Sequence, residues 1–204
     1  SSARRWVDPH APAGTGKYLA TYELDQPQVL QTPEYLAHVG EHFTPWSKRC
    51  LSRCLLFRRW ACTQILPGGA GPDPAAQALF LACGDVPAAH EAEFNRWYDE
   101  EHIALLAAVP GVLGARRFFD AEGKPRYIAL YELADAHVAG SVPWNAALET
   151  PWAKRIDSLT QGCEWILRTY IAYESQTLAP SATEGSPRGT GRGSSNAENP
   201  NHEH

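Results

Sequence analysis

The residues best suited to chemistry lie in one stretch, residues 93–103, which reads Glu-Phe-Asn-Arg-Trp-Tyr-Asp-Glu-Glu-His-Ile. At helical spacing one face of this stretch carries four residues: Phe94, Tyr98, His102 and Leu105. His102 is therefore expected to point toward apolar residues, with Asp99 three positions earlier as a side-chain partner. An imidazole beside a carboxylate can act as a general acid or base near neutral pH. His102 and Asp99 are thus the candidate catalytic residues.

The same helix also has a purely structural interpretation. A histidine on an apolar helix face is commonly a core residue whose polar atoms are satisfied by its neighbours. The acidic run at residues 99–101 equally suits a solvated helix surface. The spacing is compatible with both interpretations, so the sequence leaves catalysis and packing open as roles for His102.

The elements around this helix predict an α+β fold. Four strands are expected, over residues 78–83, 112–119, 126–133 and 165–173. Helices are expected over residues 87–109 and about 135–160, the second bent or broken at Pro143 and Pro151. The order β-α-β-β-α-β is that of a ferredoxin-like unit. The strand at 127–133 is apolar on both faces, which predicts a sheet covered on both sides.

The chain contains matching blocks, which predict an internal repeat. Three blocks recur in the same order: residues 3–8 with 115–120, residues 17–24 with 126–133, and Thr44-Pro45-Trp46 with Thr150-Pro151-Trp152. We therefore expect a first ferredoxin-like repeat at 1–65, a Gly/Pro linker at 66–76 and a complete second repeat at 77–174. The composition of residues 175–204 predicts a disordered tail.

The first repeat is expected to lack its first strand and its first helix. The first strand of a ferredoxin-like sheet is central, so its loss leaves two strand edges unpaired. The chain contains no Met, and we expect sequence upstream of Ser1, or else a partner chain, to fill the place.

Composition narrows the classes of function. The 204 residues are 44% hydrophobic and 20% charged, an ordinary globular mixture. A net charge of −5 argues against nucleic-acid binding, and no apolar run approaches the ~18 residues of a membrane span. Five cysteines and no apolar leader segment predict reduced thiols and a cytoplasmic location. The His38-Val39-Gly40-Glu41-His42 run matches an inverted zincin pattern, but Gly40 weakens the required helix, so no metal is expected.

Three segments together resemble the dimeric α+β barrel superfamily, and most of all its EthD-like and related uncharacterised branches. They are the W-Y-x-x-x-H helix at 93–103, the Pro-Gly turn and strand at 109–118, and the strand at 127–133. The resemblance covers residues 77–174 fully and 3–65 partly. It implies that two ferredoxin-like units join their sheets into a barrel, in a homodimer or as an intramolecular pseudo-dimer. The chain departs from many EthD-like members by lacking a Pro two residues after His102.

The resemblance also implies a cavity between sheet and helices. Members include lactone isomerases, polyketide cyclases, decarboxylases, cofactor-free monooxygenases and haem-binding proteins, and in several a helix histidine acts on the substrate. His102 is the matching residue. The aromatic composition suits an aromatic or polyketide-like ligand, with Arg117 available for a carboxylate or phenolate. The candidate binding residues are Trp97, Tyr98, Arg117, Phe118, Tyr127, Tyr131 and Trp144.

Two functions follow from these features. The first is a cofactor-independent enzyme that transfers a proton on a small aromatic or polyketide-like substrate, as a lyase, isomerase or cyclase does. The alternative is a non-catalytic module of the same fold that binds a small ligand or mediates oligomerisation. A third, haem-binding interpretation lacks a secure axial ligand in the sequence. A pocket beside His102 favours catalysis, and a filled core there favours the module.

Overall fold

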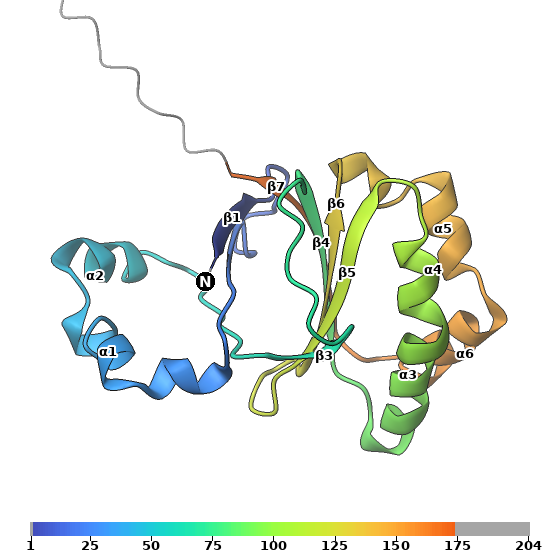
Figure 1. Ribbon diagram of the computed structural model, residues 1–204, viewed down its shortest axis with the longest axis horizontal. Helices are drawn as coiled ribbons and strands as arrows, with labels where there is room; N and C mark the ends of the chain where they lie inside the picture. Colours follow the sequence, from blue (N-terminus) through green and yellow to red (C-terminus); the bar gives the residue numbers. More distant parts are fainter. Residues whose placement is uncertain (1, 174–204) are drawn as a thin grey trace, which may run out of the picture. The chain divides into compact units, whose positions relative to one another are not determined.

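The order of the strands identifies the architecture. The computed structural model describes residues 2–173, which contain seven strands in one sheet, ordered β2-β1-β7-β4-β6-β5-β3 (Figure 1). Every neighbouring pair is antiparallel. The strands are β1 (Ala3–Val7), β2 (Tyr18–Tyr22), β3 (Thr63–Leu66), β4 (Ala78–Gly84), β5 (Val112–Phe119), β6 (Tyr127–Leu133) and β7 (Trp165–Ala172).

The four strands from β4 to β7 form a ferredoxin-like unit. Their spatial order is β7-β4-β6-β5, so the first strand of the unit is central and pairs with the third and the fourth. Helices follow the first and third strands, as the β-α-β-β-α-β order requires. The predicted α+β fold class is confirmed.

The helices of this unit cover one face of the sheet (Figure 1). After β4 the chain forms η3 (Ala88–His90), α3 (Glu91–Trp97), η4 (Tyr98–His102) and α4 (Ile103–Ala107). After β6 it forms η5 (Ala136–Val138), α5 (Val142–Leu148) and α6 (Pro151–Leu159). Pro143 and Pro151 lie in the first turns of α5 and α6, where a missing N–H costs nothing.

The central strand β6 is buried on both faces, as the sequence predicts. All seven of its residues are buried. Tyr127, Ala129, Tyr131 and Leu133 pack in the core beneath the helices. Ile128 and Leu130 pack on the opposite face, in a second core that includes Trp6 from the N-terminal hairpin.

The segment η4 is a π-helix in the middle of the long helix. Its wide turn is closed by the N–H of Ile103, which donates to the carbonyl of Tyr98 five residues earlier. This extra residue shifts the buried face by one position beyond His102. Leu106 is therefore 1% exposed and Leu105 is 39% exposed. The prediction that Leu105 shares the buried face is wrong, because it assumed α-helical spacing throughout.

The N-terminal part of the chain adds strands at both ends of the unit. β1 pairs with β7 and with β2, while β3 pairs with β5. Between β2 and β3 lie η1 (Pro27–Gln31), α1 (Pro33–Leu36), η2 (Gly40–His42) and α2 (Pro45–Leu51), and none of these helices contains a buried residue. In the zincin-like run His38 lies outside these helices and His42 lies in η2, so the two histidines do not share a helix turn.

The matched sequence blocks occupy matching local structures. The N–H of Asp8 donates to Lys17 O at 2.8 Å after β1, and the N–H of Asp120 donates to Arg126 O at 2.9 Å after β5. Likewise Thr44 and Thr150 are the N-caps of α2 and α6, each accepting from the backbone N–H three residues later.

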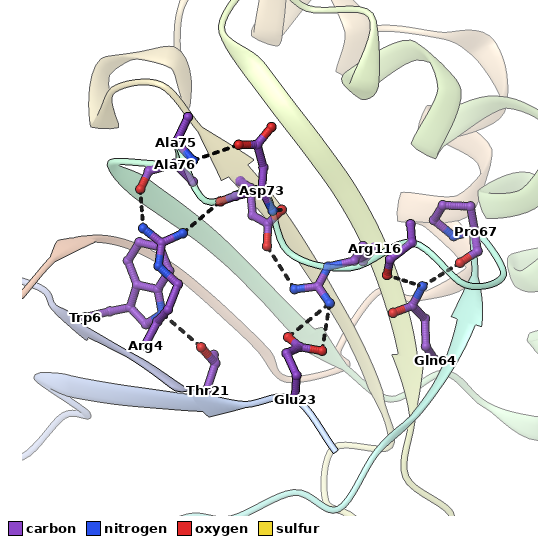
Figure 2. Close-up of polar contacts among 12 residues, drawn as sticks. Arg4, Trp6, Thr21, Glu23, Gln64, Pro67, Asp73, Ala75, Ala76 and Arg116 are labelled. Atoms are coloured by element: carbon purple, nitrogen blue, oxygen red, sulfur yellow. Dashed lines mark hydrogen bonds and ion pairs between the residues drawn. The ribbon is translucent and has the colours of Figure 1, made fainter. Parts of the chain in front are cut away.

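Polar contacts connect the N-terminal hairpin to the rest of the sheet (Figure 2). Arg116 on β5 donates to Glu132 Oε1 at 2.8 Å and to Glu23 Oε1, just beyond β2, at 3.1 Å. Arg116 and Glu132 are each 3% exposed, so this is a buried ion pair. Arg4 on β1 donates to the backbone oxygens of Asp73 and Ala76, in the segment between β3 and β4. The segment from 67 to 77, which includes most of the predicted linker, contains no helix or strand.

Candidate functional site

The most unusual polar group in the ferredoxin-like unit is the guanidinium of Arg117. It lies on β5 beneath the helices, and its side chain is 1% exposed. Three aromatic rings surround it, with centroids 4.1 Å (Tyr98), 4.8 Å (Tyr127) and 5.1 Å (Phe94) from its Cζ. Cation–π contacts of this kind gain strength when they are shielded from water.

Hydrogen bonding compensates this buried cation only in part. Arg117 Nη2 donates to Asn95 Oδ1 at 2.7 Å, and Nη1 lies 3.7 Å from Asp99 Oδ1. The Nε of Arg117 has no hydrogen-bond partner among the described residues. Burial lowers the pKa of Arg117, and the neighbouring Tyr98 and Asp99 act in the opposite direction. The Arg117 guanidinium is therefore a buried positive charge whose N–H donors are not all matched by acceptors.

A polar network joins this guanidinium to the start of the helix. Asn95 Nδ2 donates to the hydroxyl oxygen of Tyr127 at 3.2 Å, and the Tyr127 hydroxyl donates to Glu91 Oε1 at 2.5 Å. Arg126 Nη1 lies 3.3 Å from the same Glu91 oxygen. Burial and the bond to Glu91 raise the pKa of Tyr127, which keeps its hydroxyl protonated at neutral pH.

A hollow of about 300 Å³ opens beside Arg117. Its volume is at the lower end for small-molecule sites, which span roughly 300 to 1,000 Å³. The hollow is lined by Ile65, Asn95, Asp99, Arg117, Phe119 and Tyr127. It thus combines a cation, a carboxylate and an amide with aromatic and aliphatic walls, a composition suited to a small aromatic molecule that carries a negative charge.

His102 lies in a packed aromatic cluster behind this hollow. Its ring is 4.0 Å from the Trp97 centroid, 4.8 Å from Tyr98 and 6.4 Å from Tyr131. The residue is 8% exposed and does not line the hollow. Burial, and secondarily the charge of Arg117, lowers the pKa of His102 to about 3. The imidazole is therefore neutral at physiological pH.

The expected partnership of Asp99 with His102 is absent from the hydrogen bonds and ion pairs of residues 2–173. Asp99 instead faces Arg117 and the hollow, and it is 52% exposed. The physical reason is the π-helix, which contains both residues. In a turn closed across five residues, side chains three positions apart no longer stack one above the other.

The other predicted site residues divide into three groups. Arg117 and Tyr127 line the hollow with Asp99. Trp97, Tyr98 and Tyr131 form the cluster around His102, where burial raises the pKa of Tyr98 to about 12 and holds that of Tyr131 well above its usual range. Trp144 is buried against Phe80 and Tyr131, and Phe118 packs on the opposite face of the sheet.

Three residues of the hollow were not among the predicted site residues. Asn95 lies one helical turn before Asp99, and Phe119 lies two residues after Arg117 on the same face of β5, so both could have been found by extending the helix and strand periodicities. Ile65 comes from β3, about fifty residues away in the sequence. Its position depends on the pairing of β3 with β5, for which the sequence contains no local signal.

Residues 2–173 contain no helix that is long and apolar enough to cross a membrane. In the same residues no group of three or more His, Cys, Asp or Glu side chains is arranged to hold a metal ion.

Comparisons with known proteins give weak likenesses. No family model matches the chain, and no curated protein matches it. Among solved structures, a putative monooxygenase from Lactobacillus acidophilus has a TM-score of 0.36 at 15% identity, over 48% of this chain and 45% of that one. The chain thus spans less than half of that protein.

Two further structures match over about half of this chain. A NIPSNAP-like domain protein from Burkholderia xenovorans has a TM-score of 0.36 at 15% identity, over 52% of this chain and 91% of that one. HapK from Hahella chejuensis has a TM-score of 0.32 at 14% identity, over 52% and 98%. At these scores the fold assignment depends on the strand order of the chain itself.

Proposed function

We propose that the hollow beside Arg117 binds a small aromatic or polyketide-like molecule through an anionic oxygen, and that the chain transfers a proton on this molecule without a cofactor. The observation that carries the proposal is the guanidinium itself, which is buried among three rings and has one hydrogen bond to Asn95. A carboxylate, phenolate or enolate oxygen supplies the acceptor that the free donors lack.

Asp99 is the group best suited to exchange the proton. It is exposed to the hollow and lies beside Arg117. In the proposed step its carboxylate takes a proton from a carbon next to a carbonyl group of the ligand. The electron pair of the broken C–H bond forms an enolate, whose oxygen is stabilised by Arg117. Return of the proton to another atom of the enolate completes an isomerisation. In a cyclisation the enolate carbon instead attacks a second carbonyl carbon of the same ligand, the C=O π electrons move to the oxygen, and Asp99 returns the proton to that oxygen.

This proposal gives His102 a different role from the one predicted. An imidazole with a pKa of about 3 is a poor base at neutral pH, because the ideal catalytic pKa lies near the working pH. His102 instead contributes an uncharged wall to the aromatic cluster behind Arg117. The neutral ring adds no second positive charge to a region that already contains a buried cation.

Binding without chemistry is the second candidate. The packed core around His102 favours it, since the hollow does not reach the one histidine on the buried helix face. In that case Arg117 and Asn95 recognise the ligand and Asp99 has no role in proton transfer.

The test separates binding from catalysis with two probes. Binding of 2-hydroxybenzoate is followed by NMR shifts of the Asn95 and Phe119 amides. Proton transfer is followed as deuterium incorporation at C2 of 1-phenyl-1,3-butanedione in deuterium oxide, above the uncatalysed rate. Arg117→Met is expected to weaken binding by about tenfold to a hundredfold, the value of a hydrogen bond between charged groups. Arg5→Met, at an exposed position of β1, is the matched control.

The variants at Asp99 decide whether the site is catalytic. Asp99→Asn is expected to reduce exchange to the uncatalysed rate, whereas Glu100→Gln, on the exposed side of the same turn, leaves it unchanged. If both probes bind but no exchange exceeds the background, the non-catalytic function is correct. If neither probe shifts the amides around Arg117, the proposed site is wrong.

A further inference from the structure

We infer that residues 46–59, here called the basic segment, bind the surface of a lipid bilayer that contains anionic headgroups. This inference goes beyond the function proposed for the hollow and does not depend on it. The basic segment begins inside α2 and ends just before Trp60. It contains no carboxylate and five cationic side chains, which are Lys48, Arg49, Arg53, Arg58 and Arg59. Because the whole chain has a net charge of −5, the basic segment is a local reversal of the overall charge.

The cations of the basic segment lack the carboxylate partners that the matching helix α6 has. In α6, Lys154 lies 2.9 Å from Glu149 Oε2, and Arg155 pairs with Glu93. The same Lys-Arg pair follows the Thr-Pro-Trp block of α2, at residues 48–49. Among the residues that the structure describes, none of the five cations of the basic segment forms an ion pair. Their charges are therefore available to an anionic partner outside the chain.

The contacts that these cations do make leave their charges uncompensated. Lys48 Nζ donates to the backbone oxygen of Glu41 at 2.7 Å, and Arg59 Cζ lies 5.5 Å from the centroid of the Tyr35 ring. A carbonyl oxygen and an aromatic ring attract a cation, but neither carries a negative charge that would neutralise it.

Large apolar side chains project into solvent from the same segment. Leu55 is 92% exposed, Phe57 is 67% exposed and Trp46 is 68% exposed. Every residue from 52 to 59 is exposed, so the apolar run Leu55-Leu56-Phe57 adds little to the core. Single exposed apolar side chains are common, but a run of three with polar neighbours is typical of a surface that contacts a partner.

Cationic and apolar side chains are adjacent at both ends of the basic segment. Arg53 precedes the Leu55-Leu56-Phe57 run, and residues 58–59 follow it with two more arginines. In α2 the Arg49 Cζ lies 5.3 Å from the centroid of the Trp46 ring. An anionic bilayer surface suits both kinds of side chain, because its headgroups attract Lys and Arg while leucine and aromatic rings enter the boundary with the acyl chains.

Other polyanions fit the basic segment less well. A nucleic acid or an acidic peptide would attract the cations, but the aliphatic side chains of Leu55 and Leu56 cannot stack on bases as aromatic rings do. A protein groove recognises a helix or an added strand, and residues 52–59 form neither. A bilayer surface accepts the same side chains without a shaped groove, so the combination of charge and exposed leucines favours lipid.

The test measures co-sedimentation of the 204-residue chain with phosphatidylcholine vesicles, prepared with and without phosphatidylserine. The chain is expected to bind the vesicles that contain phosphatidylserine at least about tenfold more strongly, and ~1 M salt should remove most of this difference. Arg53→Gln combined with Arg59→Gln is expected to weaken binding about thirtyfold, because each cation near an anionic surface contributes about fivefold. Lys154→Gln combined with Arg155→Gln removes the same charge from α6 and is expected to leave binding unchanged.

Two further measurements test the apolar contribution and the place of contact. Leu55→Ser combined with Phe57→Ser keeps every charge and is expected to weaken vesicle binding at least about tenfold. Val142→Ser, at a position that is 84% exposed, is the control for loss of an exposed apolar side chain. Cys54 is exposed beside Leu55, and its modification by iodoacetamide should slow at least about fivefold on the anionic vesicles, because a negative surface disfavours the thiolate and headgroups restrict access. Modification of Cys163 should be unaffected.

Several results would overturn the inference. Anionic vesicles that do not retain the chain would do so, as would an unchanged rate at Cys54 on vesicles that do retain it. Equal losses in the two double variants that remove charge would show that net charge, and not the basic segment, controls binding. Retention by polyglutamate or single-stranded RNA without retention by vesicles would assign the basic segment to a soluble polyanion instead.

Discussion

The Asp99 carboxylate lies 3.7 Å from the Arg117 guanidinium, yet Asp99 is 52% exposed while Arg117 is 1% exposed. This ion pair therefore joins a solvent-exposed carboxylate to a guanidinium that is buried at the bottom of the hollow. A solvated carboxylate at this distance compensates a buried cation weakly, because water screens its charge. The protein thus maintains an incompletely compensated positive charge at a place where an apolar side chain of similar size is often as stable or more stable.

Arg117→Met is therefore expected to separate stability from binding. Exchanging an imperfectly paired buried ion for an apolar side chain of similar size is often neutral or stabilising by about 1 to 4 kcal/mol. Urea unfolding of the variant should give an unfolding free energy equal to or above that of the parent chain, while binding of 2-hydroxybenzoate weakens by about tenfold to a hundredfold. Arg117→Ala is the contrasting variant, since it leaves a cavity among three rings and should destabilise the fold. A strongly destabilised Arg117→Met would mean that the charge has a structural role.

The pH dependence of stability should reveal the neutral His102. Its pKa is lowered from 6.5 to about 3 in the folded chain by burial and by Arg117. Between these two values the unfolded chain binds a proton that the folded chain does not, so stability falls as the pH decreases from 6.5 toward 3. The slope approaches about 1.4 kcal/mol per pH unit for one proton. His102→Gln should flatten this part of the curve, whereas His137→Gln, at an exposed position, should not. An NMR titration in which the His102 ring protonates near pH 6.5 would contradict the expectation.

Two adjacent leucines test the π-helix. Leu106 is 1% exposed and Leu105 is 39% exposed, the reverse of what an uninterrupted α-helix would give. Leu106→Ala is expected to lower the free energy of unfolding by about 2 to 5 kcal/mol. Leu105→Ala is expected to change it by less than about 0.5 kcal/mol, as surface substitutions usually do. Equal losses in the two variants, measured by urea unfolding, would show that the helix has no π-helical turn in solution.

The same helix contains features that the sequence predicts and features that it does not. Phe94, Tyr98 and His102 were placed on the buried face correctly, because the extra residue of the π-helix shifts the buried face only beyond His102. Leu105 and the Asp99–His102 pairing were predicted wrongly for one shared reason, since a π-turn has no reliable sequence signature and both predictions lie within or after it. Arg117, the cation of the hollow, was named from the sequence as a candidate to hold a carboxylate or phenolate, and this role stays a prediction. Its aromatic surroundings depend on packing between helix and sheet.

Strand positions were predicted better than their pairing partners. The alternation of Tyr127, Ala129 and Tyr131 against Ile128 and Leu130 follows directly from the period of a strand. The contribution of Ile65 to the hollow does not, since contacts between β3 and β5 join distant parts of the sequence. Side chains that converge through such long-range pairing can be seen only in the folded chain.

Cysteine reactivity gives an independent test of the core beneath the sheet. Burial, and secondarily the charge of Asp120, raises the pKa of the Cys62 thiol to about 12, and burial raises that of Cys83 to about 12. At pH 8 both are almost entirely in the unreactive thiol form. Cys50 and Cys54 are exposed. Mass spectrometry after brief treatment with iodoacetamide should therefore find Cys50 and Cys54 modified and Cys62 and Cys83 unmodified, with all of them modified in urea. Rapid modification of Cys83 in the folded chain would contradict the burial of β4.

The ion pair between Arg116 and Glu132 should be the most sensitive polar contact of the fold. Both side chains are 3% exposed, and Glu132 also accepts from the backbone N–H of Asp73 at 2.8 Å. Glu132→Ala removes the buried carboxylate and leaves the buried guanidinium of Arg116 with only the partly exposed Glu23, so it is expected to lower the free energy of unfolding by about 3 to 5 kcal/mol. Glu23→Ala removes the second carboxylate on Arg116, but Glu23 is 33% exposed, and water replaces it at a cost of about 1 kcal/mol or less.

The double variant Arg116→Met, Glu132→Leu distinguishes a broken pair from lost packing. It removes both charges together, so no buried ion is left without a partner, and apolar side chains fill much of the same space. Its unfolding free energy should therefore exceed that of Glu132→Ala by several kcal/mol. Gly114→Ala provides a steric test of the same contact, because a Cβ at that position would lie 2.7 Å from Glu132 Oε2 and would push the carboxylate away from Arg116. If Glu132→Ala and Glu23→Ala cost the same in urea unfolding, the pair is more hydrated in solution than its burial implies, and the connection between the N-terminal hairpin and β5 is correspondingly loose.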